Sequence, residues 1–118
     1  MKKPTKKWRK LSRIPQHRKL MMCNMATSLF MHEKINTTLP KAMDLKRFVD
    51  RLLSRSKKMD LCARRYVARM IHDTQVQKKI FEVLHPRYTG RIGGYTQVFK
   101  MGRRMSDSAP IALIRMMQ

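Results

Sequence analysis

The sequence predicts an α+β fold: a two-layer single domain in which about four helices cover a short mixed sheet. Apolar residues recur at helical spacing through most of residues 16–86, whereas residues 95–116 contain two short runs rich in aromatic and β-branched side chains. A chain of 118 residues is enough for one domain with a modest core. We therefore expect residues 16–118 to form this domain, preceded by an extended basic arm, residues 1–15.

The first predicted helix spans residues 16–32, or extends to residue 34. Its apolar stripe occurs at i, i+4 and i+8, at Met21, Met25 and Leu29. The first turn is basic, so an external anion would compensate the cations that oppose the helix dipole there. The short β-branched run of residues 35–39 then predicts a strand.

Three further helices are predicted between residues 40 and 86. Pro40 suits the first turn of the second helix, which should end within the polar residues 54–58. Asp60 can cap the third helix. Thr74 and Gln77 match a capping box for the fourth helix, and Pro86 should stop it. The residues expected in the core from these helices are Ala42, Leu45, Val49, Leu52, Ala63, Val67, Met70, Ile71, Val76, Ile80, Val83 and Leu84.

The C-terminal part of the chain has a different pattern. Residues 87–94 form a basic, glycine-rich loop, and glycine at positions 93 and 94 permits the positive φ of a tight turn. The flanking basic and aromatic residues favour a further role, in which exposed backbone N–H groups of the loop contact phosphates of RNA. The alternative is a turn with a structural role only. Residues 95–101 and 111–116 predict two strands, joined by a polar connection.

The charge of the chain indicates the class of its partner. The formal net charge is +21 with a pI of about 11.2, and no acidic residue precedes Glu33. A packed core cannot use so many unpaired cations, whereas a nucleic acid neutralises them densely and releases its counterions. A solvated basic surface and a mitochondrial import segment share this composition. No apolar run is long enough to span a membrane.

The sequence contains no motif for catalysis, metal binding or a cofactor. The four histidines, Cys23 and Cys62 lack the short spacings of zinc ligands, and the seven carboxylates are scattered. The glycine-rich loop is neither a P-loop nor a dinucleotide fingerprint. We therefore expect no enzyme activity, no metal, no cofactor and no small-molecule substrate, and we expect both cysteines to be reduced.

Short motifs follow one another in a characteristic order along nearly the whole chain. They are Arg9-Lys10-Leu11-Ser12-Arg13, His17-Arg18, Asn24-Met25, Thr27-Ser28-Leu29, His32-Glu33-Lys34-Ile35-Asn36-Thr37-Thr38, Lys41-Ala42, Ala63-Arg64-Arg65, Ile80-Phe81, Pro86-Arg87-Tyr88, Gly93-Gly94-Tyr95-Thr96 and Ser108-Ala109-Pro110. This ordered set resembles the bacterial-type large-subunit ribosomal protein L-seventeen family, in its bacterial or organellar members. Ser12 departs from the family, which usually has glycine there.

The resemblance implies a structural constituent of the large ribosomal subunit. Its basic arm would thread into large-subunit ribosomal RNA near the polypeptide exit tunnel, with neighbouring large-subunit ribosomal proteins as further partners. Methionines in place of several leucines favour a ribosome of the mitochondrial matrix over one of the bacterial cytoplasm. The competing interpretation is a nucleoid architectural protein that binds DNA without sequence preference. An RNA-modifying enzyme has no site to support it.

The candidate RNA-binding residues come from the arm, the family motifs and the glycine-rich loop. We expect residues 1–14 to be disordered until RNA orders them. Trp8 would stack on RNA or enter a pocket of a neighbouring protein, and Tyr88 and Tyr95 would stack on unpaired bases. The full set is Lys2, Lys3, Lys6, Lys7, Trp8, Arg9, Lys10, Arg13, His17, Arg18, Lys19, Asn24, Thr37, Thr38, Lys41, Arg64, Arg65, Arg87, Tyr88, Arg91, Gly93, Gly94, Tyr95, Arg103 and Arg104.

Overall fold

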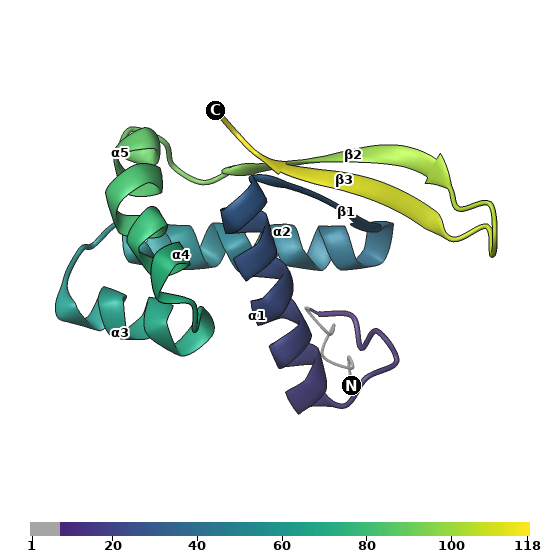
Figure 1. Cartoon of the computed structure of the whole chain (residues 1–118), viewed down its shortest axis with the longest axis horizontal. Helices are drawn as coiled ribbons and strands as arrows, with labels where there is room; N and C mark the ends of the chain where they lie inside the picture. Colours follow the sequence, from purple (N-terminus) through teal and green to yellow (C-terminus); the bar gives the residue numbers. More distant parts are fainter. Residues whose placement is uncertain (1–7) are drawn as a thin grey trace, which may run out of the picture.

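The structure, a computed structural model, describes residues 8–118 (Figure 1). Its helices are α1 Pro15–His32, α2 Leu39–Ser56, α3 Leu61–Met70, α4 Thr74–Lys79 and α5 His85–Tyr88, with a π-helical turn, η1 Ile80–Leu84, between the last two. The strands are β1 Lys34–Thr38, β2 Thr96–Arg103 and β3 Pro110–Met116. Because α4, η1 and α5 follow one another without a break, they form one bent helix. The predicted α+β class is confirmed.

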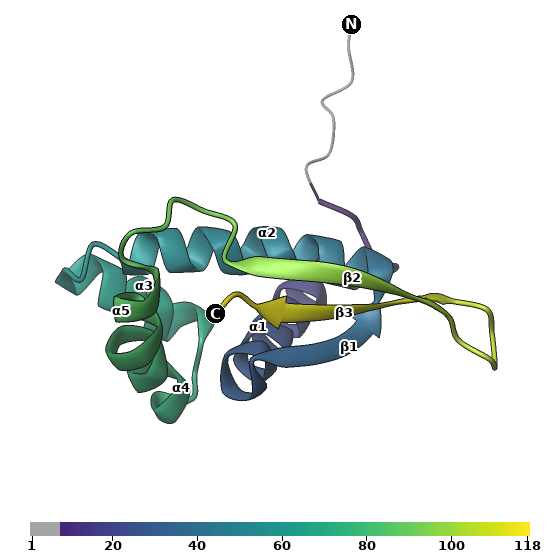
Figure 2. The same cartoon turned by 90° about the horizontal axis from the view of Figure 1, so that it is seen from above.

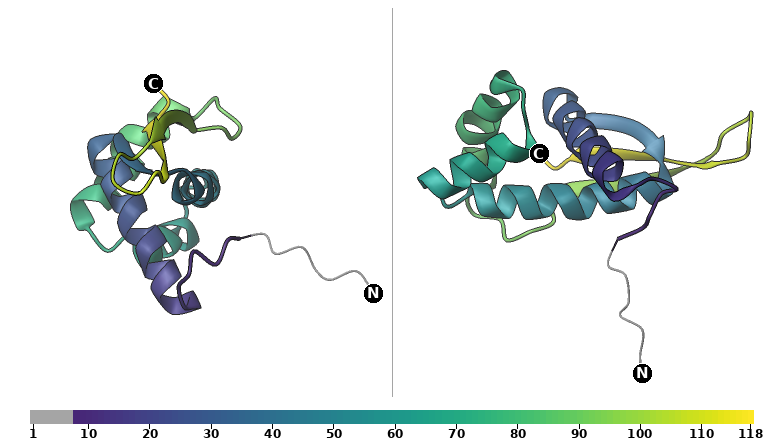
Figure 3. Two further views of the ribbon diagram at one scale, coloured as in Figure 1. Left: turned by 90° about the vertical axis from the view of Figure 1, so that its right-hand side faces the viewer. Right: turned by 90° about the horizontal axis from the view of Figure 1, so that it is seen from below.

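The three strands form one antiparallel sheet in the order β1-β3-β2. The expectation of a mixed sheet is therefore wrong. A short hairpin joins β2 to β3, and such a connection makes neighbouring strands run antiparallel. α1 and α2 cover one face of the sheet, while α3 and the bent helix lie towards one end of it (Figures 2 and 3). The β2–β3 hairpin projects past the helices at the other end (Figure 1).

The core lies between the sheet and the helices that cover it. Alternate residues of β3 face it, namely Ala112, Ile114 and Met116, as the two-residue period of a strand requires. They belong to one cluster with fully buried residues of α1 and α2: Ala26, Leu29, Phe30, Ala42, Leu45 and Val49. Burial of each large apolar side chain contributes roughly 1.5–3 kcal/mol, so this cluster is what holds the layers together.

The start of the fourth helix differs from the prediction. Asp73 caps α4, because its Oδ1 accepts hydrogen bonds from two backbone N–H groups of the first turn, at 2.8 and 3.4 Å. The predicted capping box of Thr74 and Gln77 does not form, since Gln77 Nε2 donates to the Ile71 carbonyl oxygen at 2.6 Å. The helix dipole also favours a carboxylate at this end. Asp60 caps α3 as predicted.

The bent helix does not stop at Pro86, which lies in the first turn of α5. The π turn η1 comes directly before it. The wider turn accommodates a ring that has no N–H to donate, which an ordinary helix interior cannot do. It also shifts the phase of the apolar stripe. Ile80 and Leu84 are buried, whereas Val83, predicted for the core, is 45% exposed.

The loop that follows α5 is a tight turn beside the end of α2. Gly93 and Gly94 have φ angles of +76° and +63°, which confirms the predicted positive φ. Lys57 Nζ donates to the Arg91 carbonyl oxygen, and Arg91 Nη1 donates to the Gly94 carbonyl oxygen at 3.2 Å. A Cβ at either glycine would have no other atom within 4 Å. The turn therefore needs glycine for its backbone angles and not for lack of space.

Gly94→Ala is expected to lower the free energy of unfolding by about 1 kcal/mol, because a Cβ disfavours the left-handed region. Gly90→Ala is the matched control, since Gly90 has equally open surroundings and no positive φ. It should be neutral or slightly stabilising. Urea unfolding followed by circular dichroism measures both variants. Equal effects would contradict the assigned backbone strain, whereas Gly94→Asn, which tolerates this region better, should recover part of the loss.

Candidate nucleic-acid interface

One buried carboxylate holds the N-terminal segment, residues 8–14, against the domain. Asp44 of α2 is only 1% exposed. Arg9 donates to it twice, from Nη1 to Oδ1 at 3.0 Å and from its backbone N–H to Oδ2 at 3.3 Å. Leu11 packs against the core two residues further along. A buried carboxylate that loses its partner costs several kcal/mol, so this pair fixes where the segment lies.

The attached segment borders a hollow of about 240 Å³. The ring of Trp8 lies on one side of it, and the Arg51 guanidinium carbon lies 5.3 Å from the ring centroid, within cation–π range. Buried Met22 and half-buried Phe48 supply apolar surface. The complete lining is Trp8, Arg9, Pro15, Arg18, Lys19, Met22, Asp44 and Phe48. The hollow therefore combines an aromatic, apolar lining with a basic edge.

The start of α1 adds positive charge beside the hollow. Its first turn contains no acidic residue, and the side chains of His17 and Lys19 are exposed. Arg18 Nη1 donates to the Lys10 carbonyl oxygen at 3.4 Å, which links the helix to the N-terminal segment. The end of the helix contributes roughly half a positive charge of its own. This corner of the molecule therefore favours an anion.

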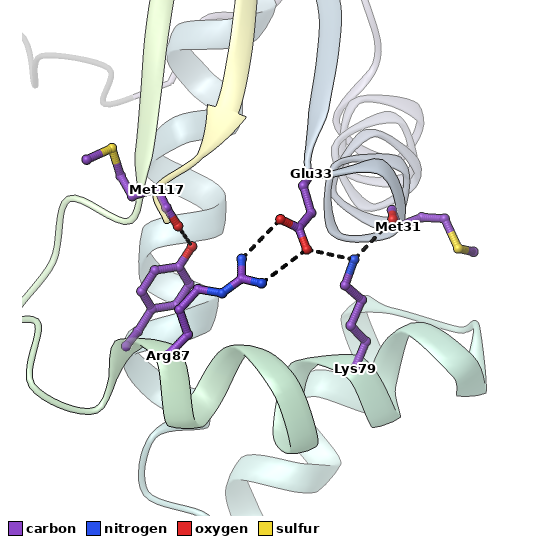
Figure 4. A network of polar contacts seen from close by, with 6 residues as sticks. Met31, Glu33, Lys79, Arg87 and Met117 are labelled. Atoms are coloured by element: carbon purple, nitrogen blue, oxygen red, sulfur yellow. Dashed lines mark hydrogen bonds and ion pairs between the residues drawn. The ribbon is translucent and has the colours of Figure 1, made fainter.

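A second polar network lies at the other end of α1. Glu33 ends this helix with a φ of +62°, and its N–H donates to the Leu29 carbonyl oxygen at 2.7 Å. Its carboxylate accepts hydrogen bonds from Arg87 at 3.1 and 3.3 Å and pairs with Lys79 at 3.1 Å (Figure 4). Lys79 Nζ also donates to the Met31 carbonyl oxygen at 3.1 Å. The network ties the end of α1 to the bent helix.

This network changes the acidity of its members. The hydrogen bond from Arg87 lowers the pKa of Glu33 below its ordinary value; burial of the carboxyl opposes this, and Lys79 adds to it. The same pairing raises the pKa of Arg87, chiefly through the hydrogen bond to Glu33. A candidate RNA-binding cation is thus already engaged by a carboxylate of its own chain.

The predicted RNA-binding residues lie in several separate regions. Lys2, Lys3, Lys6 and Lys7 fall outside the described residues. The hollow brings together Trp8, Arg9, Arg18 and Lys19, with Lys10, Arg13, His17 and Asn24 on the same segment or helix. Thr37, Thr38 and Lys41 lie where β1 passes into α2. Arg64 and Arg65 on α3, Arg87 and Tyr88 on α5, and the following loop with Arg91, Gly93, Gly94 and Tyr95 lie towards the end opposite the hollow. Arg103 and Arg104 lie at the end of the hairpin (Figure 1).

Two tyrosines expected to stack on bases belong to the core. Tyr88 is 3% exposed and Tyr95 is 1% exposed, and their ring centroids lie 5.3 Å apart. The Tyr88 hydroxyl donates to the Met117 carbonyl oxygen. Base stacking needs an accessible ring face, so that prediction is wrong for both residues in this structure. Tyr88 ends α5 instead of lying in the loop, which turns its ring inward.

The predicted disorder of the arm is wrong for residues 8–14, because they pack on the domain through Arg9 and Leu11. Residues 1–7 lie outside the described part of the chain. Trp8, which we expected to meet RNA or another protein, contacts Arg51 of its own chain.

Sequence reasoning missed Asp44, Phe48 and Arg51 as parts of the site. A signal was present, because Asp44 directly precedes Leu45 on the apolar stripe of α2. A carboxylate beside the core needs a cation, but the sequence does not say which one.

The rest of residues 8–118 offers little further chemistry. No group of three or more His, Cys, Asp or Glu side chains in this range could hold a metal ion. None of the described helices is both long and apolar enough to cross a membrane. Cys23 is buried and Cys62 is exposed, and both are free thiols. Burial raises the pKa of the Cys23 thiol, an effect that Lys19 partly offsets, so Cys23 behaves as a small apolar residue.

Comparison with known proteins gives one consistent result. A sequence profile of the family described as ribosomal protein L17 matches residues 21–117. The chain is 46% identical over 113 residues to large ribosomal subunit protein bL17 of Syntrophotalea carbinolica, an alignment that covers 96% of this chain and 73% of that protein. It is 48% identical over 106 residues to bL17 of Azorhizobium caulinodans, an alignment that covers 90% of this chain and 76% of that protein. It is 46% identical over 107 residues to bL17 of Roseobacter denitrificans, which covers 91% of this chain and 76% of that protein.

Arg9→Met is expected to lower the free energy of unfolding by about 2 kcal/mol or more, because it leaves the buried Asp44 carboxylate without its cation. Lys10→Met is the control, since its exposed side chain should change stability by less than about 0.5 kcal/mol. The double variant Arg9→Met with Asp44→Leu should recover most of the loss. Urea unfolding measures the set. If Arg9→Met were as mild as Lys10→Met, the segment would not pack on the domain.

Stability should also depend on pH through Glu33. Its pKa is lower in the folded protein than in the unfolded chain, so its stabilising effect is present above about pH 4.3 and is lost as pH falls through the folded pKa. The unfolding free energies of the wild type and Glu33→Gln should differ by about 1 kcal/mol at pH 6, and the difference should shrink as the pH falls below about 4.3. A difference that stayed constant with pH would contradict this role of the carboxylate.

Proposed function

Because this chain belongs to the ribosomal protein L17 family, we propose that it is a structural constituent of the large ribosomal subunit that binds and stabilises large-subunit ribosomal RNA. The observation that carries the proposal is the family match over residues 21–117, together with relatives named large ribosomal subunit protein bL17. Neighbouring large-subunit ribosomal proteins are its further partners.

The distribution of charge supports an RNA-binding role. The chain has 28 lysines and arginines against seven carboxylates. Asp44 pairs with Arg9, and Glu33 pairs with Lys79 and Arg87, all within this chain. Asp60 and Asp73 serve as helix caps. Few acidic groups are left to compensate the remaining cations. Phosphates of a nucleic acid would supply that compensation, with release of counterions.

The site itself supports binding better than catalysis. The hollow beside Trp8 holds one carboxylate, Asp44, which is buried and ion-paired with Arg9. A general acid–base pair needs two positioned titratable groups within reach of a substrate, and this arrangement lacks the second. We expect no enzyme activity. No observation favours the alternative of a DNA-binding nucleoid protein, for which charge alone was the argument.

The proposal includes two finer features, the position on the ribosome and the location in the cell. A position near the polypeptide exit tunnel follows from the family resemblance alone. For location, the basic start of the chain and the methionines in place of several leucines favour the mitochondrial matrix, whereas the three relatives above come from bacteria. Fusing residues 1–30 to a fluorescent reporter tests this point: mitochondrial import supports the matrix, and diffuse fluorescence contradicts it.

Sedimentation tests the proposed function. A tagged chain expressed in cells should migrate with the large subunit in a sucrose gradient that separates the subunits. Changing Lys10 and Lys19 to Gln should reduce incorporation several-fold, because they flank the basic corner. Changing Lys58 and Lys78 to Gln removes the same charge from other exposed positions and serves as the control. Association with DNA, and absence from the large subunit, would overturn the proposal.

A further inference from the structure

We infer that the hollow beside Trp8 receives one unstacked base of RNA, with the adjoining phosphate bound at the basic edge formed by Arg18 and Lys19. This inference rests on the proposed function, because it names the part of an RNA that this corner of the molecule takes.

Two aromatic rings supply the surface for the base. Trp8 and Phe48 both line the hollow, the first from the N-terminal segment and the second from α2. The Arg51 guanidinium carbon lies 5.3 Å from the centroid of the Trp8 ring and so holds that ring in place. The Arg9 contacts to Asp44 fix the backbone next to it. Unpaired bases stack on such rings, and a ring fixed before binding loses little entropy.

The size of the hollow suits a single base. Its volume is about 240 Å³, below the roughly 300–1,000 Å³ of sites that take drug-sized ligands. A stacked or paired duplex presents phosphates and groove edges to a protein, and its bases cannot enter. Met22, which is 5% exposed, adds apolar surface to the lining, and such surface suits the flat face of a base.

Charge distinguishes a nucleotide from an apolar peptide side chain. Arg9 already neutralises Asp44, the one carboxylate in the lining, at 3.0 Å. Arg18 and Lys19 then form a cationic edge beside the start of α1, where no acidic residue lies in the first turn. An apolar side chain would fit the rings but leave this edge uncompensated. A nucleotide satisfies both, because the faces of its base stack on apolar rings and its phosphate is anionic.

The chain offers its own probe, because Trp8 is its only tryptophan. The experiment titrates the full chain with an RNA hexamer and with an abasic hexamer that has the same number of phosphates, at one salt concentration. The RNA should quench Trp8 fluorescence and bind about fivefold more tightly or better, since stacking favours the base-bearing strand. Equal affinity and equal quenching with both hexamers would overturn the inference and leave phosphate contact only.

A pair of variants connects this difference to the hollow. Phe48→Leu keeps apolar volume and removes the ring, so the base-dependent difference in affinity should shrink to about twofold or less. Phe99→Leu makes the same change at a phenylalanine of β2 that is 38% exposed and lies outside the hollow, and should leave the difference intact. Circular dichroism checks that both variants fold. If Phe48→Leu kept the full difference, the base would bind elsewhere and the inference would be wrong.

The two proposals fail in different ways. A chain that sediments with the large subunit but does not distinguish the two hexamers retains its proposed function and loses this inference. A chain absent from the large subunit fails the sedimentation test whatever the hexamers show.

Discussion

The buried carboxylate of Asp44 constrains the most basic part of this molecule. A chain with a net charge of +21 repels itself, and its N-terminal residues have no acidic neighbour in sequence before Glu33. Asp44, which is 1% exposed, compensates one of these cations by accepting two hydrogen bonds from Arg9. The side chain of Arg9 remains about half exposed, so only one end of the pair is fully desolvated. Everything that we infer about the hollow depends on this attachment, because it is what brings Trp8 beside α2.

The other carboxylates serve the fold in a similar way. Glu33 joins the end of α1 to the bent helix through Arg87 and Lys79. Asp50 accepts a hydrogen bond from the Tyr95 N–H at 3.2 Å and so holds the start of β2 against α2. Burial raises the pKa of Asp50, and the Tyr95 N–H partly offsets that effect. Because most carboxylates bind groups of the fold itself, the surface keeps its excess of cations, which is the property an RNA-binding protein needs.

Much of the fold could be predicted from the sequence because local signals agreed with the global packing. The first helix, the cap at Asp60 and the two C-terminal strands all form as predicted. The errors have two causes, a local irregularity and partners that are distant in sequence. Pro86 predicts the end of a helix because the π turn that accommodates it leaves no simple signal in the sequence. The sequence predicts Tyr88 in the loop and Tyr95 at the start of a strand, with both rings free to stack on bases, whereas tertiary packing turns both rings inward. The sequence could indicate that the N-terminal segment binds an anion, yet not that one such anion is Asp44.

The attachment of the N-terminal segment to the domain affects how the protein binds RNA. A segment fixed before RNA arrives holds Trp8 beside Arg18 and Lys19 of α1. Binding then loses less conformational entropy than it would with a disordered arm. The most direct test is amide hydrogen exchange of the Arg9 N–H, followed by NMR in the free protein without RNA. The account predicts slowed exchange that becomes fast in Asp44→Leu, because this N–H donates to the Asp44 carboxylate. Exchange in the wild type at the rate of an unstructured peptide would contradict it.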